Sequence, residues 1–288
     1  MADQAGQRQQ ITPDAPSVRL LVLIDNTALF PELSCEWGFS LALTLKSGAT
    51  WIWDTGQSSL FLRNARLLGL DLARAKGVAL SHGHYDHTGG LSALIEHGFQ
   101  GQVFAHARWS ARRFAVSPQG KARSIGPPDS ALQALTSVST LTTSRILDEE
   151  LTMISDITRS PQAYQAVQGF YFDPEGQNPD TVPDDAALLL NTGSGPVLIL
   201  GCCHSGVANT LKTVGARTGV KRLRAVVGGL HLVNAPMWAV EESIEALQAF
   251  GSPEVYAGHC TGETAFEALR RMLPGRVHPM GSGLELFF

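Results

Sequence analysis

The chain has 288 residues, of which 44% are hydrophobic and 17% charged, and its formal net charge is −4. These values are typical of a globular protein with a large core, in one domain or two, and they exclude a disordered or coiled-coil chain. Because nucleic-acid backbones bind to basic faces, the negative charge predicts no nucleic-acid partner, although a local basic cluster remains open.

The sequence indicates neither a membrane protein nor a disulfide-rich one. No stretch approaches the roughly 18 consecutive apolar residues of a membrane helix, and the first residues lack the apolar core of a signal peptide. We therefore expect a cytoplasmic protein with no membrane partner. Two of the cysteines are adjacent and the set has no regular spacing, so disulfides are not expected. The cysteines are Cys35, Cys202, Cys203 and Cys260.

The first part of the chain is predicted to be a tail followed by strands. Residues 1–16 are polar and end in a Pro-rich run, which predicts a mobile N-terminal tail. Residues 17–288 are predicted to form a single domain. The segments 18–25, 39–45 and 50–53 have the composition of strands, so the fold has a β-rich beginning.

A strand and helix alternation comes next. Segment 58–68 carries apolar residues at helical spacing, and segment 77–80 is typical of a short buried strand. A histidine-rich run follows that strand directly, and it leads into a predicted helix over 89–97 and a strand over 102–105. This order predicts a βαβ unit with functional groups at the carboxyl end of a strand.

The second half repeats the alternation after two loop regions. Segments 117–130 and 173–185 are rich in Pro, Gly and Ser or Asp, so we expect loops there, within insertions near 112–150 and 171–185. Short apolar strands between helices predict sheets covered by helices. The strands are expected at 187–191, 197–200, 225–227 and 254–257, and the helices at 207–218, 240–250 and 263–273.

The histidine-rich run suggests a metal site. Three imidazoles and one carboxylate lie within six positions of the chain. They are His82, His84, Asp86 and His87. In an extended segment, positions 82, 84 and 86 project to one side, and a turn into the next helix brings His87 towards the same point. These ligands suit zinc, iron or manganese with a position left for water. The alternative is a polar loop whose histidines only bond the backbone.

The run His82-x-His84-x-Asp86-His87 resembles the signature of the metallo-β-lactamase superfamily. Asp54 lies where that superfamily usually has an Asp at the end of an earlier strand. Further motifs resemble one branch, which includes the archaeal 7,8-dihydropterin-6-methyl-4-(β-D-ribofuranosyl)aminobenzene 5'-phosphate synthases and their bacterial relatives. These motifs lie at 37–40, 81–91, 201–206 with Asn209, 228–232 and 258–262. The resemblance spans about residues 18–288 and implies an α/β fold, the αββα sandwich of two mixed β-sheets packed face to face with helices outside.

The resemblance also implies a ligand set for one or two zinc ions, with iron or manganese as alternatives. His204 and His259 each follow a predicted strand through one glycine, which supports them independently. Taken alone, each is more often an ordinary loop histidine than a ligand. By the resemblance, one metal is held by His82, His84 and His204, and a second by Asp86, His87 and His259.

One position departs from the superfamily pattern. Many members have a Gly-Asp pair whose carboxylate bridges two metals, whereas this chain has Gly201-Cys202. The second metal could therefore bind weakly, or Cys202 or Cys203 could supply a thiolate that favours zinc, or these residues could simply pack near the site.

Other candidates have weaker support. Asp54 is expected to orient a ligand histidine. His231, in a glycine-rich segment, is a candidate general acid or phosphate contact, with a structural role as the alternative. His106 is expected to be a loop or packing residue, and His97 and His278 to be ordinary surface or packing residues.

The predicted function is that of a metal-dependent hydrolase. A bound divalent ion lowers the pKa of its water to about 7, and Asp86 could hold or deprotonate that water. The expected substrate is a small phosphorylated or heterocyclic ester-type metabolite. Some of five basic residues are hypothesised to bind its phosphate, with a solvated helix face as the alternative. These residues are Arg108, Arg112, Arg113, Lys121 and Arg123.

Two other functions remain open at this point. The resemblance implies a transferase that condenses a pterin methyl-diphosphate with an aminobenzene ribofuranosyl phosphate. The other alternative is a non-catalytic metal-binding sensor, which the intact His/Asp run makes the weakest of the three.

Overall fold

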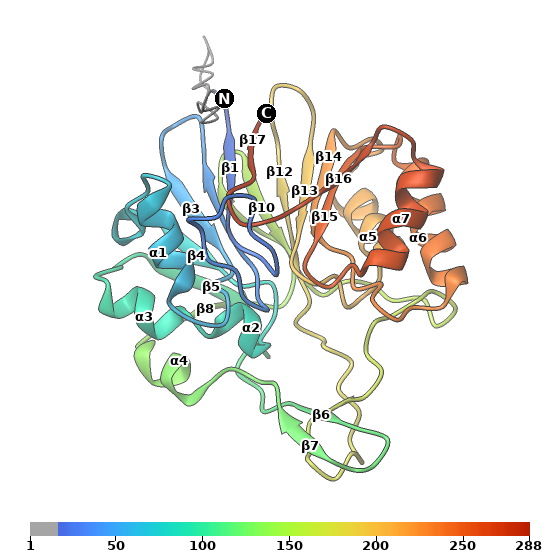
Figure 1. The fold of residues 1–288 in the computed structure, drawn as a ribbon, viewed down its shortest axis with the longest axis horizontal. Helices are drawn as coiled ribbons and strands as arrows, with labels where there is room; N and C mark the ends of the chain where they lie inside the picture. Colours follow the sequence, from blue (N-terminus) through green and yellow to red (C-terminus); the bar gives the residue numbers. More distant parts are fainter. Residues whose placement is uncertain (1–16) are drawn as a thin grey trace, which may run out of the picture.

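Two seven-stranded mixed sheets pack face to face in the computed structural model, which describes residues 17–288 (Figure 1). The predicted tail over 1–16 lies outside the described residues. Helices cover the outer face of each sheet, so the layers follow the order helix, sheet, sheet, helix. The predicted fold class is confirmed.

The first sheet has the strand order β17-β1-β2-β3-β4-β5-β8. The strands β17, β1, β2 and β3 pair antiparallel, and β3, β4, β5 and β8 pair parallel. The strands are β1 (Arg19–Ile24), β2 (Ser40–Thr44), β3 (Thr50–Trp53), β4 (Gly77–Ala79), β5 (Gln102–His106), β8 (Ser139–Leu141) and β17 (Glu285–Phe287). The accompanying helices are α1 (Leu60–Leu67), α2 (Tyr85–Thr88), α3 (Leu91–Glu96) and α4 (Asp129–Ala134), with a short 3-10 turn at Leu72–Arg74.

The second sheet has the order β16-β15-β14-β13-β12-β10-β9, and its strands from β13 to β16 are parallel. The strands are β9 (Arg145–Asp148), β10 (Leu151–Ile154), β12 (Ala187–Leu190), β13 (Val197–Leu200), β14 (Ala225–Gly229), β15 (Glu254–Gly258) and β16 (Val277–Pro279). The helices beside it are α5 (Val207–Thr218), α6 (Met237–Ala249) and α7 (Glu263–Met272).

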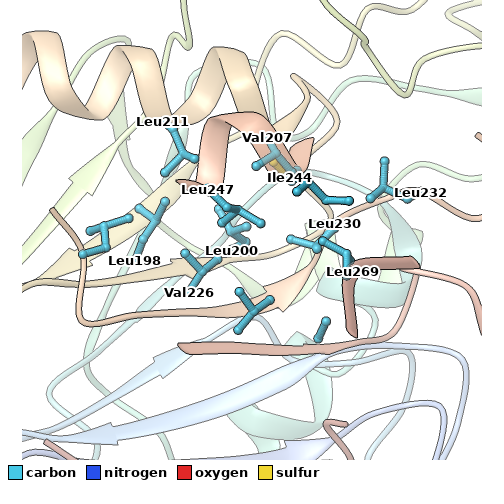
Figure 2. Packing of buried hydrophobic residues seen from close by; sticks show 14 of the residues in the cluster. Leu198, Leu200, Val207, Leu211, Val226, Leu230, Leu232, Ile244, Leu247 and Leu269 are labelled. Carbon is cyan, nitrogen blue, oxygen red and sulfur yellow. The ribbon is translucent and has the colours of Figure 1, made fainter. Parts of the chain in front are cut away.

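The central strands of each sheet are buried on both faces, whereas edge strands such as β9 and β17 are partly exposed. Successive side chains of a strand point to opposite faces. Leu20 of β1 accordingly belongs to the cluster between the sheets, and its neighbour Leu21 to the cluster under the helices of the first sheet. On the second sheet, Leu198 and Val226 pack against Leu247 of α6 (Figure 2). A strand that is buried on both faces must be apolar at every position. Such strands are the ones that the sequence predicts best.

A third, three-stranded sheet lies at the lower end of the molecule in Figure 1. Its order is β11-β6-β7, with β6 (Phe114–Val116), β7 (Ala122–Ser124) and β11 (Phe170–Tyr171). The expectation of a loop over 117–130 is wrong in part, because this segment contains β7 and the first residues of α4. Three-residue strands are too short to show an alternating pattern in the sequence.

The predicted helix over 89–97 also differs in detail. The chain forms α2 and α3 as separate short helices, with Gly89 and Gly90 between them. Helix α6 begins at Met237, earlier than predicted, because Pro236 precedes it in an extended conformation. Among residues 17–288, the structure has no helix with both the length and the apolar character to span a bilayer.

Candidate metal centre

The predicted ligands come together at one end of the sandwich, where loops from both sheets meet. The loop after β4 and helix α2 supply four of them, and the loops after β13 and β15 supply one each. All are buried. They are His82, His84, Asp86, His87, His204 and His259.

Three imidazoles converge around the first position. His82 Nε2 lies 2.9 Å from His84 Nδ1 and 3.2 Å from His204 Nε2. Since Zn–N bonds are about 2.0–2.1 Å long, two nitrogens on a tetrahedral ion lie roughly 3.3 Å apart. These three nitrogens are buried and close together. Their arrangement fits three ligands around one shared cation better than hydrogen bonds among the rings.

A second group lies beside the first. His87 Nε2 and His259 Nε2 are 3.2 Å apart. Asp86 Oδ2 lies 3.8 Å from the His259 nitrogen and 4.0 Å from the His87 nitrogen. Two imidazoles and a carboxylate are a donor set that suits zinc, iron or manganese.

Hydrogen bonds on the far side of the rings fix which nitrogen faces the centre. Asp54 Oδ2 accepts from His87 Nδ1 at 2.7 Å and from Ser81 Oγ at 2.6 Å. Because Ser81 gives its only proton to Asp54, its oxygen accepts from His82 Nδ1 at 2.9 Å. Each ring thus carries its proton at Nδ1 and leaves Nε2 free to bind an ion.

The two histidines from the second sheet are oriented in the same way. His204 Nδ1 donates to the Ala166 carbonyl oxygen at 2.7 Å, and His259 Nδ1 lies 3.2 Å from Asn26 Oδ1. Asn26 Nδ2 also donates to the His259 carbonyl oxygen. Sequence reasoning missed Asn26 and Ala166, since no local pattern links them to residues far along the chain.

Most of the imidazoles are held in the neutral form. Burial, reinforced by the neighbouring rings and Arg113, lowers the pKa of His82 and His84 well below the ordinary value. Burial likewise lowers the pKa of His259 to about 3. Burial also opposes protonation of His87, but Asp54 and Asp86 outweigh it and raise its pKa to about 9. An ion at the second position would therefore displace a proton from His87.

The backbone around the centre adopts an unusual conformation. Asp54, Cys203, His231 and His259 have φ values of 58°, 59°, 46° and 51°, in the left-handed region that non-glycine residues avoid. Such residues cluster at functional sites, where the surrounding structure holds them in place. Gly83 is required for a different reason, because a Cβ there would lie 1.7 Å from the Trp109 carbonyl oxygen.

The cysteines after β13 face different surroundings. Cys202 Sγ lies 3.1 Å from His87 Nε2, at the centre. Cys203 Sγ instead contacts Thr210 Oγ1 at 3.4 Å and belongs to the core beside the second sheet. Of the two thiolate candidates, only Cys202 is near the predicted ligands.

A third group adjoins the centre. Cys202, His231 and Cys260 each place one ligand atom within 4.8 Å of the others. The His231 ring lies 4.3 Å from the His204 ring, and its Nδ1 is buried with no hydrogen-bond partner among the described residues. Cys260 was not predicted as a site residue, although it directly follows His259.

The remaining histidines lie outside these groups. His106 Nδ1 accepts from the Arg108 backbone N–H at 3.1 Å, so it stabilises the turn after β5. His278 pairs with Glu254 at 2.8 Å and stacks on Tyr256, and His97 is exposed.

The hypothesis that Arg113 binds substrate phosphate is wrong, and so is the alternative of a solvated helix face. Residues 107–113 form turns and irregular structure rather than a helix. Arg113 is fully buried, with its guanidinium 2.6 Å from Asp184 Oδ1 and 3.5 Å from Asp180 Oδ2. Asp184 Oδ2 in turn accepts from the Gly83 N–H at 2.8 Å. Arg113 therefore anchors the histidine-rich loop. The other four basic residues of the cluster are exposed.

A family model described as the metallo-beta-lactamase superfamily matches residues 38–207. The chain belongs to this superfamily. One similar solved structure is described as Tm1679, a metal-dependent hydrolase of the β-lactamase superfamily. That structure has a TM-score of 0.80 and 29% identity, and the match covers 93% of this chain and 98% of the other.

Two curated relatives come from Methanocaldococcus jannaschii. One is named 7,8-dihydropterin-6-methyl-4-(beta-D-ribofuranosyl)-aminobenzene-5'-phosphate synthase, and it is 28% identical over 209 residues, which cover 70% of this chain and 71% of the relative. The other is an uncharacterized protein, 28% identical over 258 residues that cover 87% of this chain and 92% of the relative. This chain is therefore similar both to a hydrolase and to a synthase. These similarities support an enzymatic function and leave two classes of reaction open.

Proposed function

We propose that this metallo-β-lactamase superfamily member is a metal-dependent hydrolase of a small ester-type metabolite. The observation that carries the proposal is the convergence of His82, His84 and His204. His82 Nε2 lies 2.9 Å from His84 Nδ1 in the same loop and 3.2 Å from His204 Nε2 in a loop of the other sheet. Zinc suits this donor set, with one or two ions. When bound, such an ion supplies an activated water at neutral pH.

Metal binding and proton transfer are assigned to different side chains. In the proposal, His82, His84 and His204 hold one ion, and Asp86, His87 and His259 hold a second. Asp86 orients the attacking water and accepts its proton, because its carboxylate lies within 4.0 Å of both His87 and His259. His231, next to His204, donates a proton to the leaving group.

Aromatic side chains near the centre support a heterocyclic substrate. The Phe170 ring of β11 lies 5.3 Å from the His84 ring and 5.6 Å from the His204 ring. On the side of the second group, the Trp37 ring lies 5.5 Å from the His259 ring and Trp37 is 48% exposed. A planar group that stacks on either ring would gain about 0.5–1.5 kcal/mol.

An exposed cation supports a phosphorylated substrate. A cavity of about 420 Å³ is lined in part by Tyr85, Ser110, Arg112 and Ser124. Tyr85 directly precedes Asp86 in the chain, and none of the candidate metal ligands lines the cavity itself. Arginine and hydroxyl groups match the geometry of phosphate oxygens.

The second candidate is the transferase reaction, which condenses a pterin methyl-diphosphate with an aminobenzene ribofuranosyl phosphate. It is favoured by the similarity to the archaeal synthase, 28% identical over 209 residues. The aromatic faces and Arg112 would serve a pterin and a phosphate equally well.

The test combines metal analysis with a substrate screen. Purified protein is assayed for bound metal and for turnover of bis(p-nitrophenyl) phosphate, p-nitrophenyl phosphate and lactones, beside His84→Ala. Chelator-sensitive turnover that the variant lacks supports the hydrolase. Arg112→Ala should then raise KM for p-nitrophenyl phosphate and leave lactones unaffected. Bound metal with every ester inert, but with condensation of the pterin and aminobenzene substrates, supports the transferase. Bound metal with neither activity points to the sensor.

A further inference from the structure

One sulfur atom lies between the two groups of candidate ligands. Cys202 Sγ lies within 4.8 Å of the ligand nitrogens of His82 and His204, and also within 4.8 Å of those of His87 and His259. Each pair of histidines belongs to a different metal position. Cys202 is the one side chain that appears in both groups within the described residues 17–288.

The local backbone explains why Cys202 reaches this place. Cys202 follows β13 through Gly201, where a Cβ would lie 2.2 Å from Ser81 Oγ, so only glycine lets the two loops approach so closely. Cys203 has a φ of 59°, and this turn sends the Cys203 side chain towards Thr210 while Cys202 and His204 face the centre. Two adjacent cysteines thus have separate environments.

We propose that the Cys202 thiolate is the ligand shared by the two metal positions, because its sulfur lies within reach of both pairs of histidine nitrogens. This inference rests on the proposed metal centre. It assigns the bridging role to sulfur, and a bridging sulfur makes the pair of sites softer than a bridging carboxylate would. Because nitrogen and oxygen sites already favour zinc and cobalt over manganese, we expect the sulfur to make this preference larger.

Cys260 is the competing source of sulfur. Its Sγ lies 3.6 Å from the Cys202 carbonyl oxygen and within 4.8 Å of the His231 ligand atom. However, Cys260 is grouped only with Cys202 and His231. It shares no group with His82, His204, His87 or His259, the four histidines that Cys202 joins. Its thiol is placed to contact Cys202 and His231 rather than both metal positions.

The test reads the zinc–sulfur bond directly. Wild-type protein loaded with two equivalents of zinc is examined by X-ray absorption at the zinc edge, where a thiolate ligand gives a Zn–S distance of about 2.3 Å. We expect this signal in the wild type and in the matched controls Cys203→Ser and Cys260→Ser. We expect it to vanish in Cys202→Ser and Cys202→Asp, with only nitrogen and oxygen neighbours left.

A competition experiment gives a second readout. Cys202→Asp puts a carboxylate in the place of the thiolate, so it should bind two ions and shift its preference from zinc towards manganese by roughly tenfold or more. Circular dichroism of each variant shows whether it folds as the wild type does.

Several outcomes overturn the inference. A Zn–S signal that persists in Cys202→Ser, or one lost in Cys260→Ser, assigns the sulfur elsewhere. Two zinc ions bound by the wild type without any sulfur neighbour also reject Cys202, yet they leave the hydrolase proposal standing. A wild type that binds no zinc, iron or manganese rejects both.

Discussion

At the scale of single residues, the partner behind each histidine decides whether its ring can bind an ion. Asp54 orients two of the histidine rings. It accepts hydrogen bonds from His87 and Ser81, and Ser81 in turn orients His82. Charged partners behind ligand histidines also make the rings more basic. A single carboxylate therefore reaches both metal positions.

Asp54→Asn should weaken metal binding without disturbing the backbone. Asparagine tolerates the left-handed φ of 58° at this position, but its amide would donate where Asp54 accepts. We expect zinc affinity at the second position to fall roughly 10- to 100-fold, measured by competition with a chelator. The exposed Asp129→Asn serves as the control. Equal affinities in Asp54→Asn and the wild type would contradict this role.

Asp25 makes stability depend on pH. Burial raises the pKa of its carboxyl from 3.8 to about 7, although backbone N–H groups of Asn26 and His259 act in the opposite direction. Its Oδ2 is buried without a hydrogen-bond partner among the described residues. The folded protein thus holds a proton that the unfolded chain releases above pH 4. This contribution to stability is complete below the unfolded pKa and is lost as pH rises through about 7.

Asp25→Asn should remove this dependence. Relative to the variant, metal-free wild type should lose free energy of unfolding between pH 5 and pH 8, with an upper limit of about 3 kcal/mol for the two pH units between 5 and the folded pKa of about 7. Urea unfolding in the presence of chelator, at both pH values, measures the difference. A gap between the two proteins that stays constant with pH would show that Asp25 ionises normally.

At the scale of elements, local patterns predicted some segments well and others not at all. The strand over 197–200 and the helix over 207–218 have the predicted bounds, because an apolar run and a helical repeat are each bounded by glycines. In contrast, β6 pairs with β11, so that Phe114 lies opposite Tyr171. Such short strands are held by distant partners and carry no pattern of their own.

The same contrast applies to the site. The cluster from His82 to His87 is local, so its residue types and spacing alone indicate a metal site. The place of Cys202 beside His87 and near Cys260 depends on the order β13-β14-β15 and on how the sheets meet. Neighbours along the chain contain no information about that arrangement.

Arg113 links the small sheet to the histidine-rich loop, and its loss should be costly. Arg113→Met would leave Asp180 and Asp184 buried without a counter-ion. Removing one partner of a buried ion pair typically costs about 3–5 kcal/mol. We expect a loss of this size in urea unfolding of Arg113→Met. The neighbouring Arg112→Met is exposed and should change stability by less than about 0.5 kcal/mol. Similar losses in both variants would exclude a specific role for the buried pair.

At the scale of the whole molecule, the candidate centre joins the two sheets. The loop after β4 and helix α2 belong to the first sheet's half, whereas His204 and His259 follow strands of the second. Apolar packing makes up the core between the sheets, and Trp51 Nε1 donates to Asp148 Oδ2 at 2.9 Å across it. An ion held from both sides would therefore couple the two halves at one end, in addition to any role in catalysis.

Zinc should raise the unfolding temperature of the wild type, and this gain should depend on both halves. An ion that binds only the folded state adds about 4 kcal/mol at a free concentration 1,000 times its Kd. His204→Ala and His82→Ala each remove a ligand from one half, so each should lose most of the zinc-induced rise in a thermal melt. Comparing each variant with and without zinc cancels any change in its metal-free stability. His278→Ala, which alters a surface histidine paired with Glu254, should keep the full rise. If His204→Ala responds to zinc as strongly as the wild type, the second sheet supplies no ligand and the two halves are not coupled through the metal.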